Sequence, residues 1–201
     1  MGYCGWASID ELDRQYHDHE WGILVHDDWR MFEHLTLECL QCGCSWALML
    51  KKREIFQQGF DNFEFDKAAA YDESDIERIL NTEGMIRSPR KVWAMINNAQ
   101  CYQKVREEYG FFCDYIWGFA GGKTILYQGH ASGPIPVSNG LSARISKGLR
   151  RRGFKYVGAV TIYSHLQACG TINDHDKECP CYQHIVANYP TVNKRRDHEV
   201  I

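Results

Sequence analysis

The chain has 201 residues, of which 44% are hydrophobic and 24% charged, and its formal net charge is −3. These values are ordinary for a soluble globular domain and argue against a disordered or fibrous protein. The first ten residues have neither a basic start nor an apolar run, and no window holds the roughly 18 continuous apolar residues of a membrane helix. We therefore expect a cytoplasmic protein without a signal peptide.

Helical signals dominate from the start of the chain. Ser8 and Glu11 fit a capping box for a short helix toward Tyr16. Asp28 can cap a second helix that extends to about Cys42. Both segments carry their apolar residues at helical spacing.

Further helices are predicted after Gly43, which interrupts the chain. Ser45 caps the segment WALMLKKREIFQ, and Asp66 and Ser74 each open a short helix. A long helix starts at Ser88-Pro89, where a cap precedes a proline at the first helical position, and it ends before the glycine at 110.

The second half of the chain predicts a loop and then two helices. Residues 118–140 are rich in Gly, Pro and Ser and predict an irregular connection, with KTILYQG as the one modest strand candidate. Ser142 starts a helix that Gly153 stops, and AVTIYSHLQACG is a helix that Gly170 stops. The expected class is all-α.

Nine cysteines are many for such a chain. Their odd number, without a signal peptide, argues against a disulfide framework and leaves metal ligation, nucleophilic chemistry or apolar filling. Cys39, Cys101, Cys113 and Cys169 lie in apolar helical contexts, and we interpret them as filling.

Four of the remaining cysteines and histidines could form a metal site. Cys4 and His17 have twelve residues between them, and His175 and Cys179 are four apart near the other end of the chain. A Cys₂His₂ set suits tetrahedral zinc, and four protein ligands leave no open position, so such a metal would be structural. Cys181 could replace Cys179, and buried cysteines with surface histidines are the plainer alternative.

The charge is unevenly distributed. Between Asp114 and Asp174 there is no acidic residue but seven basic ones, so this interval is +7 and the rest of the chain is −10. Such asymmetry favours a face for a polyanion, although a solvated basic helix is the alternative.

Two helices within this interval flank a short turn, over about residues 142–169. Gly153 and Gly158 bracket the turn, Lys155 lies in it, and Arg151 and Arg152 precede it. Backbone N–H groups at the start of a helix favour phosphate. The pattern is typical of a helix-hairpin-helix that grips a DNA backbone; a plain basic helical hairpin is the alternative.

A carboxylate and several aromatic residues predict a ligand pocket. Glu38 falls among apolar residues of its helix, and Trp46 begins the helix after the Gly43 break. Together with Trp6, Tyr16 and Trp21 they could line one cavity, in which rings stack on a flat heterocycle and the carboxylate orients it. The ordinary alternatives are core aromatics and a surface glutamate.

These residues, in this order, resemble the 3-methyladenine DNA glycosylase I (TAG) family. The matching stretches are CGW at 4–6, YHDHEWG at 16–22, LE at 37–38, SW and LKKRE at 45–54, IR at 86–87, RRGFKYVG at 151–158, QACG at 167–170, NDH at 173–175 and the cysteines at 179 and 181. The resemblance covers about residues 3–182. It divides the chain into a TAG-like domain, 1–182, and a short exposed C-terminal extension, 183–201.

The resemblance implies an all-α, helix-hairpin-helix DNA glycosylase architecture with a pocket between two helical lobes. It also implies that Glu38 recognises a flipped base, that Trp46 stacks on it, and that one structural zinc joins the N- and C-terminal regions. The implied zinc ligands are Cys4, His17, His175 and Cys179, and the implied further pocket aromatics are Trp6, Tyr16 and Trp21.

The activity implied is monofunctional hydrolysis of the N-glycosidic bond of 3-methyladenine in double-stranded DNA, by a monomer without lyase activity. Family members commonly have small or aliphatic residues where this chain has Cys39, Cys42 and Cys44, which predicts an altered pocket floor. The rival functions are a DNA-binding module without chemistry, a catalytic-zinc hydrolase and, more weakly, a redox protein.

Overall fold

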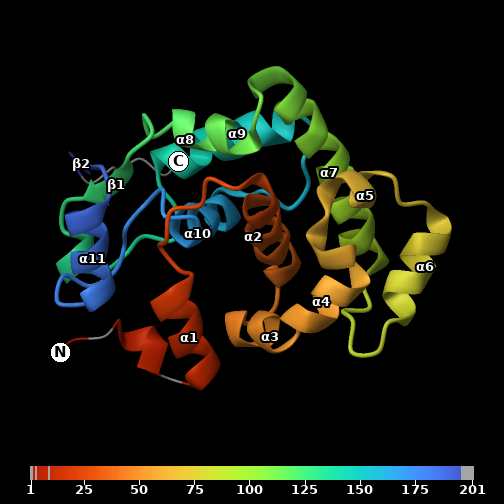
Figure 1. The fold of residues 1–201 in the computed structure, drawn as a ribbon, viewed down its shortest axis with the longest axis horizontal. Helices are drawn as coiled ribbons and strands as arrows, with labels where there is room; N and C mark the ends of the chain where they lie inside the picture. The colour runs from red at the N-terminus through yellow and green to blue at the C-terminus, as the bar shows by residue number, and fades with distance from the viewer. Residues whose placement is uncertain (1, 3, 9, 196–201) are drawn as a thin grey trace.

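The computed structural model describes residues 2, 4–8 and 10–195. It is mostly helical, with α2 and α10 near its centre and a short strand pair at one edge (Figure 1). The helices are α1 (Glu11–His19), α2 (Asp28–Gln41), α3 (Trp46–Lys51), α4 (Arg53–Gly59), α5 (Phe65–Ala69), α6 (Glu73–Asn81), α7 (Pro89–Tyr109), α8 (Phe112–Gly118), α9 (Gly140–Arg151), α10 (Ala159–Ala168) and α11 (Pro180–Asn188). The strands are β1 (Thr124–Tyr127) and β2 (Thr191–Lys194), and the short 3₁₀ helices are η1 (Gly5–Ser8), η2 (Asp61–Phe63) and η3 (His130–Ser132).

Three helices begin at an aspartate close to the predicted cap. Asp10, Asp27 and Asp72 accept hydrogen bonds from backbone N–H groups in the first turns of α1, α2 and α6. An aspartate satisfies these groups and adds a negative charge at the positive end of the helix. The predicted caps were wrong by one or two residues: Ser8, Asp28 and Ser74.

The break at Gly43 is confirmed. Gly43 has φ +83, and the Ser45 side chain accepts from the backbone N–H of Leu48 at the start of α3. The single helix predicted after Ser45 is instead two, α3 and α4, separated at Lys52. Helix α7 starts with proline and ends at Tyr109, before Gly110, as predicted.

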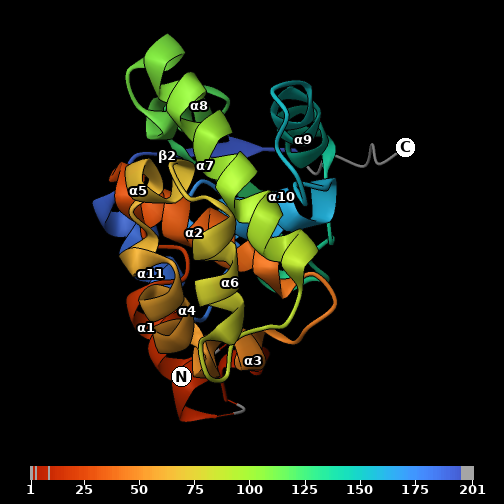
Figure 2. The ribbon, with the colours of Figure 1, turned by 90° about the vertical axis from the view of Figure 1, so that its right-hand side faces the viewer.

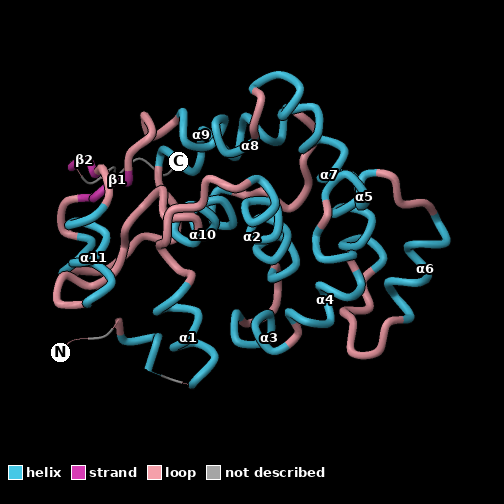
Figure 3. Tube along the Cα trace, in the orientation of Figure 1, coloured by secondary structure: helices cyan, strands magenta, loops and turns pink. Residues whose placement is uncertain are grey.

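Other elements have weaker local signals. Helix α8 precedes the predicted connection, and α9 starts at Gly140, capped by Asn139, with Ser142 as the other half of its capping box. Strand β1 lies within KTILYQG and pairs in parallel with β2 (Figure 3). Helix α11 runs through the predicted boundary at residue 182, so the chain beyond it is part of the fold up to Lys194.

The core is centred on α2, which packs against α10, α7 and α8. Eleven of the 14 residues of α2 are buried, so the helix presents core residues on nearly every side. The buried Lys91 of α7 donates from Nζ to the carbonyls of Leu40 (2.6 Å) and Cys42 (2.7 Å), which closes the C-terminal end of α2. No helix in the described part of the chain is both long enough and apolar enough to span a bilayer.

Candidate active site

One pocket of about 360 Å³ brings together residues from five regions of the chain: the N-terminal segment, α2, α3, the loop before α9, and α10. Its size falls in the range usual for small-molecule sites. Helix α2 supplies Glu38 and α3 supplies Trp46, while the N-terminal segment and α10 form the other walls. The lining residues are Trp6, Tyr16, Trp21, Glu38, Gln41, Trp46, Ile135, Ser164 and Gln167.

Glu38 is the acidic group of this pocket. It is 5% exposed, and its Oε2 atom has no hydrogen-bond partner among the described residues. Burial raises the pKa of the Glu38 carboxyl from 4.5 to about 8, because no cation compensates for the lost hydration. A buried polar atom without a partner is costly, so this carboxyl is suited to a ligand that supplies the missing interaction.

Aromatic rings form most of the pocket wall. The rings of Trp6 and Trp21 meet edge to face with centroids 5.0 Å apart, and those of Tyr16 and Trp46 lie at 5.0 Å and 49°. The pKa of the Tyr16 hydroxyl is raised well above its usual range by burial and by the nearby Glu38, so it stays a neutral group. The buried indole N–H of Trp46 has no partner among the described residues.

Every residue predicted for the pocket therefore lines it. Sequence reasoning did not include Gln41, Ile135, Ser164 or Gln167. Gln41 lies one turn after Glu38 and could have been found from helical spacing. The other three depend on how α10 and the loop before α9 pack against α2, which has no local sequence signal.

Behind the aromatic wall, the metal-ligand cluster Cys4, His17, His175 and Cys179 is fully buried. His175 Nδ1 lies 3.6 Å from Cys4 Sγ and 3.1 Å from His17 Nε2, and Cys179 Sγ lies 3.5 Å from His17 Nε2. Zinc bonds of about 2.0–2.3 Å in a tetrahedron separate the ligand atoms by about 3.3–3.8 Å. The four donor atoms therefore fit one tetrahedral ion.

Both histidines are oriented by a contact on the other ring nitrogen. His17 Nδ1 lies 2.7 Å from the carboxylate of Asp18, and His175 Nε2 lies 3.1 Å from the carbonyl oxygen of Trp21. Such contacts fix which nitrogen faces the metal. Gly22 allows the second one: a Cβ there would lie 2.7 Å from His175 Nε2.

The alternative fourth ligand, Cys181, faces the wrong side of the histidine. Its Sγ lies 4.0 Å from His17 Nδ1, whereas the cluster uses Nε2 of the same ring. Cys179 is therefore the better ligand. Four protein donors also fill a tetrahedral ion, so the cluster is suited to holding structure.

The comparisons with known proteins agree with this arrangement. The family model described as methyladenine glycosylase matches residues 6–183. The chain belongs to the methyladenine glycosylase family. Its similarity to individual members covers nearly their whole length. It is 41% identical to the DNA-3-methyladenine glycosylase 1 of Escherichia coli K12 over 182 residues, which are 90% of this chain and 97% of that protein.

Solved structures of family members have the same fold. A crystal structure of 3-methyladenine DNA glycosylase I (TAG) superposes with a TM-score of 0.84 at 40% identity, covering 90% of this chain and 99% of that one. A variant of such an enzyme in complex with 3-methyladenine has a TM-score of 0.85 at 34% identity, covering 90% and 98%.

In this member of the methyladenine glycosylase family, a turn over residues 152–158 joins α9 to α10. We call it the hairpin turn. Gly153 has φ +95, and Lys155 is exposed while its backbone is held by two hydrogen bonds with Asn98 of α7, at 2.7 and 3.0 Å. Gly158 is the N-cap residue of α10. It has no side chain to accept a hydrogen bond, so it leaves the first backbone N–H groups of that helix uncapped.

Arg151, the last residue of α9, and Arg152, the first residue of the hairpin turn, differ in their contacts. Arg151 is exposed, whereas Arg152 forms a bidentate ion pair with Glu108 at 2.6 and 2.9 Å. Arg152 also lies over the rings of Tyr109 and Tyr115. It therefore joins α9 to the end of α7 and is a weaker candidate for phosphate contact than Arg151.

The three cysteines expected at the pocket floor of this family member lie elsewhere. The thiols of Cys39 and Cys42 contact the Lys155 carbonyl (3.8 Å) and the Thr161 hydroxyl (3.8 Å), and Cys44 packs against the core. None of the three is among the pocket's lining residues. The prediction of an altered floor is wrong, because the Cys39 thiol points toward the hairpin turn, the Cys42 thiol points toward α10, and Cys44 packs against the core.

Proposed function

We propose that this protein is a monofunctional DNA glycosylase that releases 3-methyladenine from alkylated double-stranded DNA. The observation that carries this proposal is the buried Glu38 carboxyl, whose Oε2 atom has no hydrogen-bond partner among the described residues, in a pocket walled by aromatic rings. The activity named for the E. coli relative and the solved complex with 3-methyladenine support the same substrate.

Charge explains how such a pocket would select a damaged base. Alkylation at N3 makes the adenine ring of the nucleotide cationic. The faces of Trp46 and Tyr16 favour a cation. A bound cation in turn favours the ionised form of Glu38, and the carboxylate compensates for its charge and accepts its hydrogen bonds. Neutral adenine carries no positive charge, so it gains neither the cation–π attraction nor the charge compensation. Flipping the nucleotide out of the duplex costs a few kcal/mol, and least at a damaged base.

The cationic base leaves without being protonated. The electron pair of the bond between the sugar C1′ and the base moves onto the base, which becomes neutral. Water adds to C1′ and releases one proton. Glu38 stabilises the cation up to the transition state, and no lysine among the pocket's lining residues is available to form a covalent intermediate with the sugar.

We propose one structural zinc ion, held by Cys4, His17, His175 and Cys179. The donor distances fit tetrahedral zinc, and thiolate with imidazole is its preferred ligand set. The ion would supply no chemistry. It would fix the backbone around Trp21, and thereby the aromatic wall.

For the grip on DNA we propose that α9 and α10 act as a helix-hairpin-helix. Lys155 and Arg151 would contact phosphates, Gly153 and Gly158 would let a strand approach the backbone N–H groups, and Arg152 would support the turn. We propose that it acts as a monomer in the cytoplasm, whose reducing conditions suit nine cysteines that are free in the structure.

The test is chromatography of bases released from methylated duplex DNA. We expect free 3-methyladenine without strand cleavage, and its loss in Glu38→Gln, which keeps the side-chain shape but cannot ionise. Release by metal-depleted, still folded protein would exclude the rival catalytic-zinc hydrolase. DNA binding without release of any base would overturn the proposal and leave the binding module.

A further inference from the structure

A second hollow, of about 430 Å³, lies beside the hairpin turn and away from the candidate pocket. We call it the side groove. It is lined by Pro89, Arg90, Trp93 and Ala94 of α7 and by Lys155 and Tyr156 of the hairpin turn. Its two aromatic residues are unusually exposed for their size, Trp93 at 53% and Tyr156 at 38%.

The fold holds the two walls of the side groove together. Asn97 Nδ2 donates to the carbonyl of Gly153 at 2.9 Å, and the neighbouring Asn98 makes the two hydrogen bonds to Lys155. Trp93 precedes Asn97 by four residues, so it lies on the face of α7 that holds the hairpin turn. The exposed rings are therefore parts of one rigid surface.

Backbone conformation fixes the other wall. Tyr156 has φ +57, a left-handed conformation that bulky residues rarely adopt. The Tyr156 carbonyl is contacted by the thiol of Cys39 at 3.7 Å, from the buried side of the turn. A strained residue that displays a ring to solvent beside a cationic turn points to a role outside the core.

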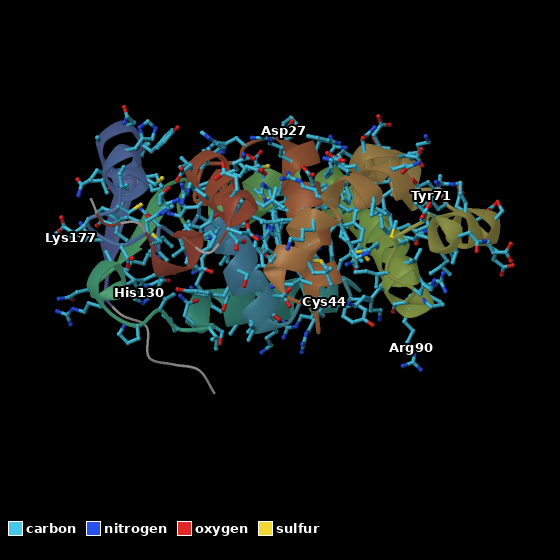
Figure 4. All side chains as sticks on the ribbon, turned by 90° about the horizontal axis from the view of Figure 1, so that it is seen from below. Asp27, Cys44, Tyr71, Arg90, His130 and Lys177 are labelled. Atoms are coloured by element: carbon cyan, nitrogen blue, oxygen red, sulfur yellow. The ribbon has the colours of Figure 1, made fainter. Side chains whose placement is uncertain are left out.

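The charges beside the side groove favour a phosphate chain. Among the residues that the structure describes, neither Arg90 nor Lys155 takes part in an ion pair. Arg90 projects outward from the ribbon in Figure 4, and the start of α7 lies on the same side of the molecule as α9 and α10 in Figure 2. On the other side of Trp93, α6 presents Asp72 and Glu73, which repel phosphate.

We infer that the side groove holds one nucleotide of the DNA strand that passes the hairpin turn. Its phosphate lies between Arg90 and Lys155, and its sugar or base lies against the rings of Trp93 and Tyr156. Proteins that hold single-stranded nucleic acid without reading its sequence combine aromatic rings with cations in the same way. The inference rests on the proposed DNA grip of the hairpin and extends it to α7.

The experiment measures binding of a labelled duplex that carries a stable abasic-site analogue, by fluorescence anisotropy. We expect Trp93→Ala to bind about tenfold more weakly than the wild type. Tyr156→Asn, a residue that tolerates the left-handed backbone, should weaken binding in the same direction. Arg90→Gln should lower the slope of log affinity against log salt by about one.

Phe111→Ala is the matched control. Phe111 is 55% exposed and lies beyond the other end of α7, whose last residue, Tyr109, is about 24 Å of helix from Trp93. It should bind as the wild type does. Shortening the duplex on one side of the abasic analogue should abolish the difference between Trp93→Ala and the wild type, because the strand then ends before the side groove.

Equal affinity of Trp93→Ala, Tyr156→Asn and wild type for the full-length duplex, with unchanged melting temperatures, would overturn this inference alone. A change of oligomeric state in these variants, with DNA binding intact, would also overturn it and assign the side groove to protein contacts. A wild-type protein that neither binds the duplex nor releases 3-methyladenine would overturn the proposed function as well.

Discussion

The side-chain amide of Gln167 donates a hydrogen bond of 2.9 Å to Oδ2 of Asp174, so a residue of the pocket wall is oriented by a buried carboxylate behind it. The same carboxylate accepts from the Tyr163 hydroxyl at 2.6 Å and lies 2.7 Å from His130 Nδ1. A carboxylate oxygen is an acceptor, so the amide nitrogen of Gln167 faces it and the amide oxygen faces away.

We therefore expect Gln167→Met to impair base release while the fold is kept. The substitution preserves length but removes both the hydrogen bond to Asp174 and a polar group of the pocket. A lost hydrogen bond of about 1 kcal/mol corresponds to roughly a fivefold lower kcat/KM for 3-methyladenine. Gln15→Met, at an exposed position of α1, is the control. Equal kcat/KM for both variants would show that Gln167 has no part in the reaction.

The raised pKa of Glu38 predicts a pH-dependent stability. Below pH 4.5 the carboxyl is protonated in both the folded and the unfolded chain. Between pH 4.5 and about 8 only the unfolded chain ionises this carboxyl, which favours the unfolded state. The free energy of unfolding therefore falls as pH rises through this window. The loss has an upper limit of about 5 kcal/mol.

Calorimetry across this window checks the sign. Glu38→Gln cannot ionise, so its melting temperature should increasingly exceed that of the wild type as pH rises from 4.5 to 8. Glu54→Gln, at an exposed position of α4, should follow the wild type. Parallel curves for Glu38→Gln and the wild type would contradict the desolvation argument.

Removing the metal should destabilise the protein and disturb its pocket. We expect about one zinc per chain, and a melting temperature that falls by several degrees after chelation, because buried thiolates and imidazoles lose their shared partner. Cys179→Ser should lower the zinc content and Cys181→Ser should not. The reverse pattern would assign the fourth ligand to Cys181.

Lys91 should matter for stability far more than a surface lysine. Lys91→Met leaves the carbonyls of Leu40 and Cys42 without this donor at the negative end of α2, and we expect a loss of about 2 kcal/mol in the free energy of unfolding. Lys104→Met, exposed on the same helix, is the control. Denaturant unfolding with equal midpoints for the two variants would contradict this.

Features that depend on residues close together in the chain were predicted correctly. The Gly43 break, the Ser45 cap and the proline that starts α7 follow from local backbone rules, and the structure confirms them. Aspartates next to the predicted caps decided the exact starts of α1, α2 and α6, because several side chains within two residues can satisfy the same N–H groups.

The features that the sequence did not predict depend on long-range packing. Strand β2 reads TVNK and has no alternating pattern, so only its partner β1 identifies it as a strand. Ser164 and Gln167 lie on a helix that is apolar on most sides, where sequence alone does not tell the core face from the pocket face. Cys39 and Cys42 were placed near Glu38 along the chain, but the rotation of the helix turns their thiols toward the hairpin.

The metal-ligand cluster also has a consequence for the order of events during synthesis. Cys4 and His175 are 171 positions apart, so half of the donor set leaves the ribosome long before the other half. Trp6, Tyr16 and Trp21 are synthesised together with that first half. A chain interrupted before His175 lacks half of the donor set and the ring against which Trp21 packs. The ring of Trp21 packs against that of His175 in the finished fold, so this part of the aromatic wall is complete only after translation has passed His175.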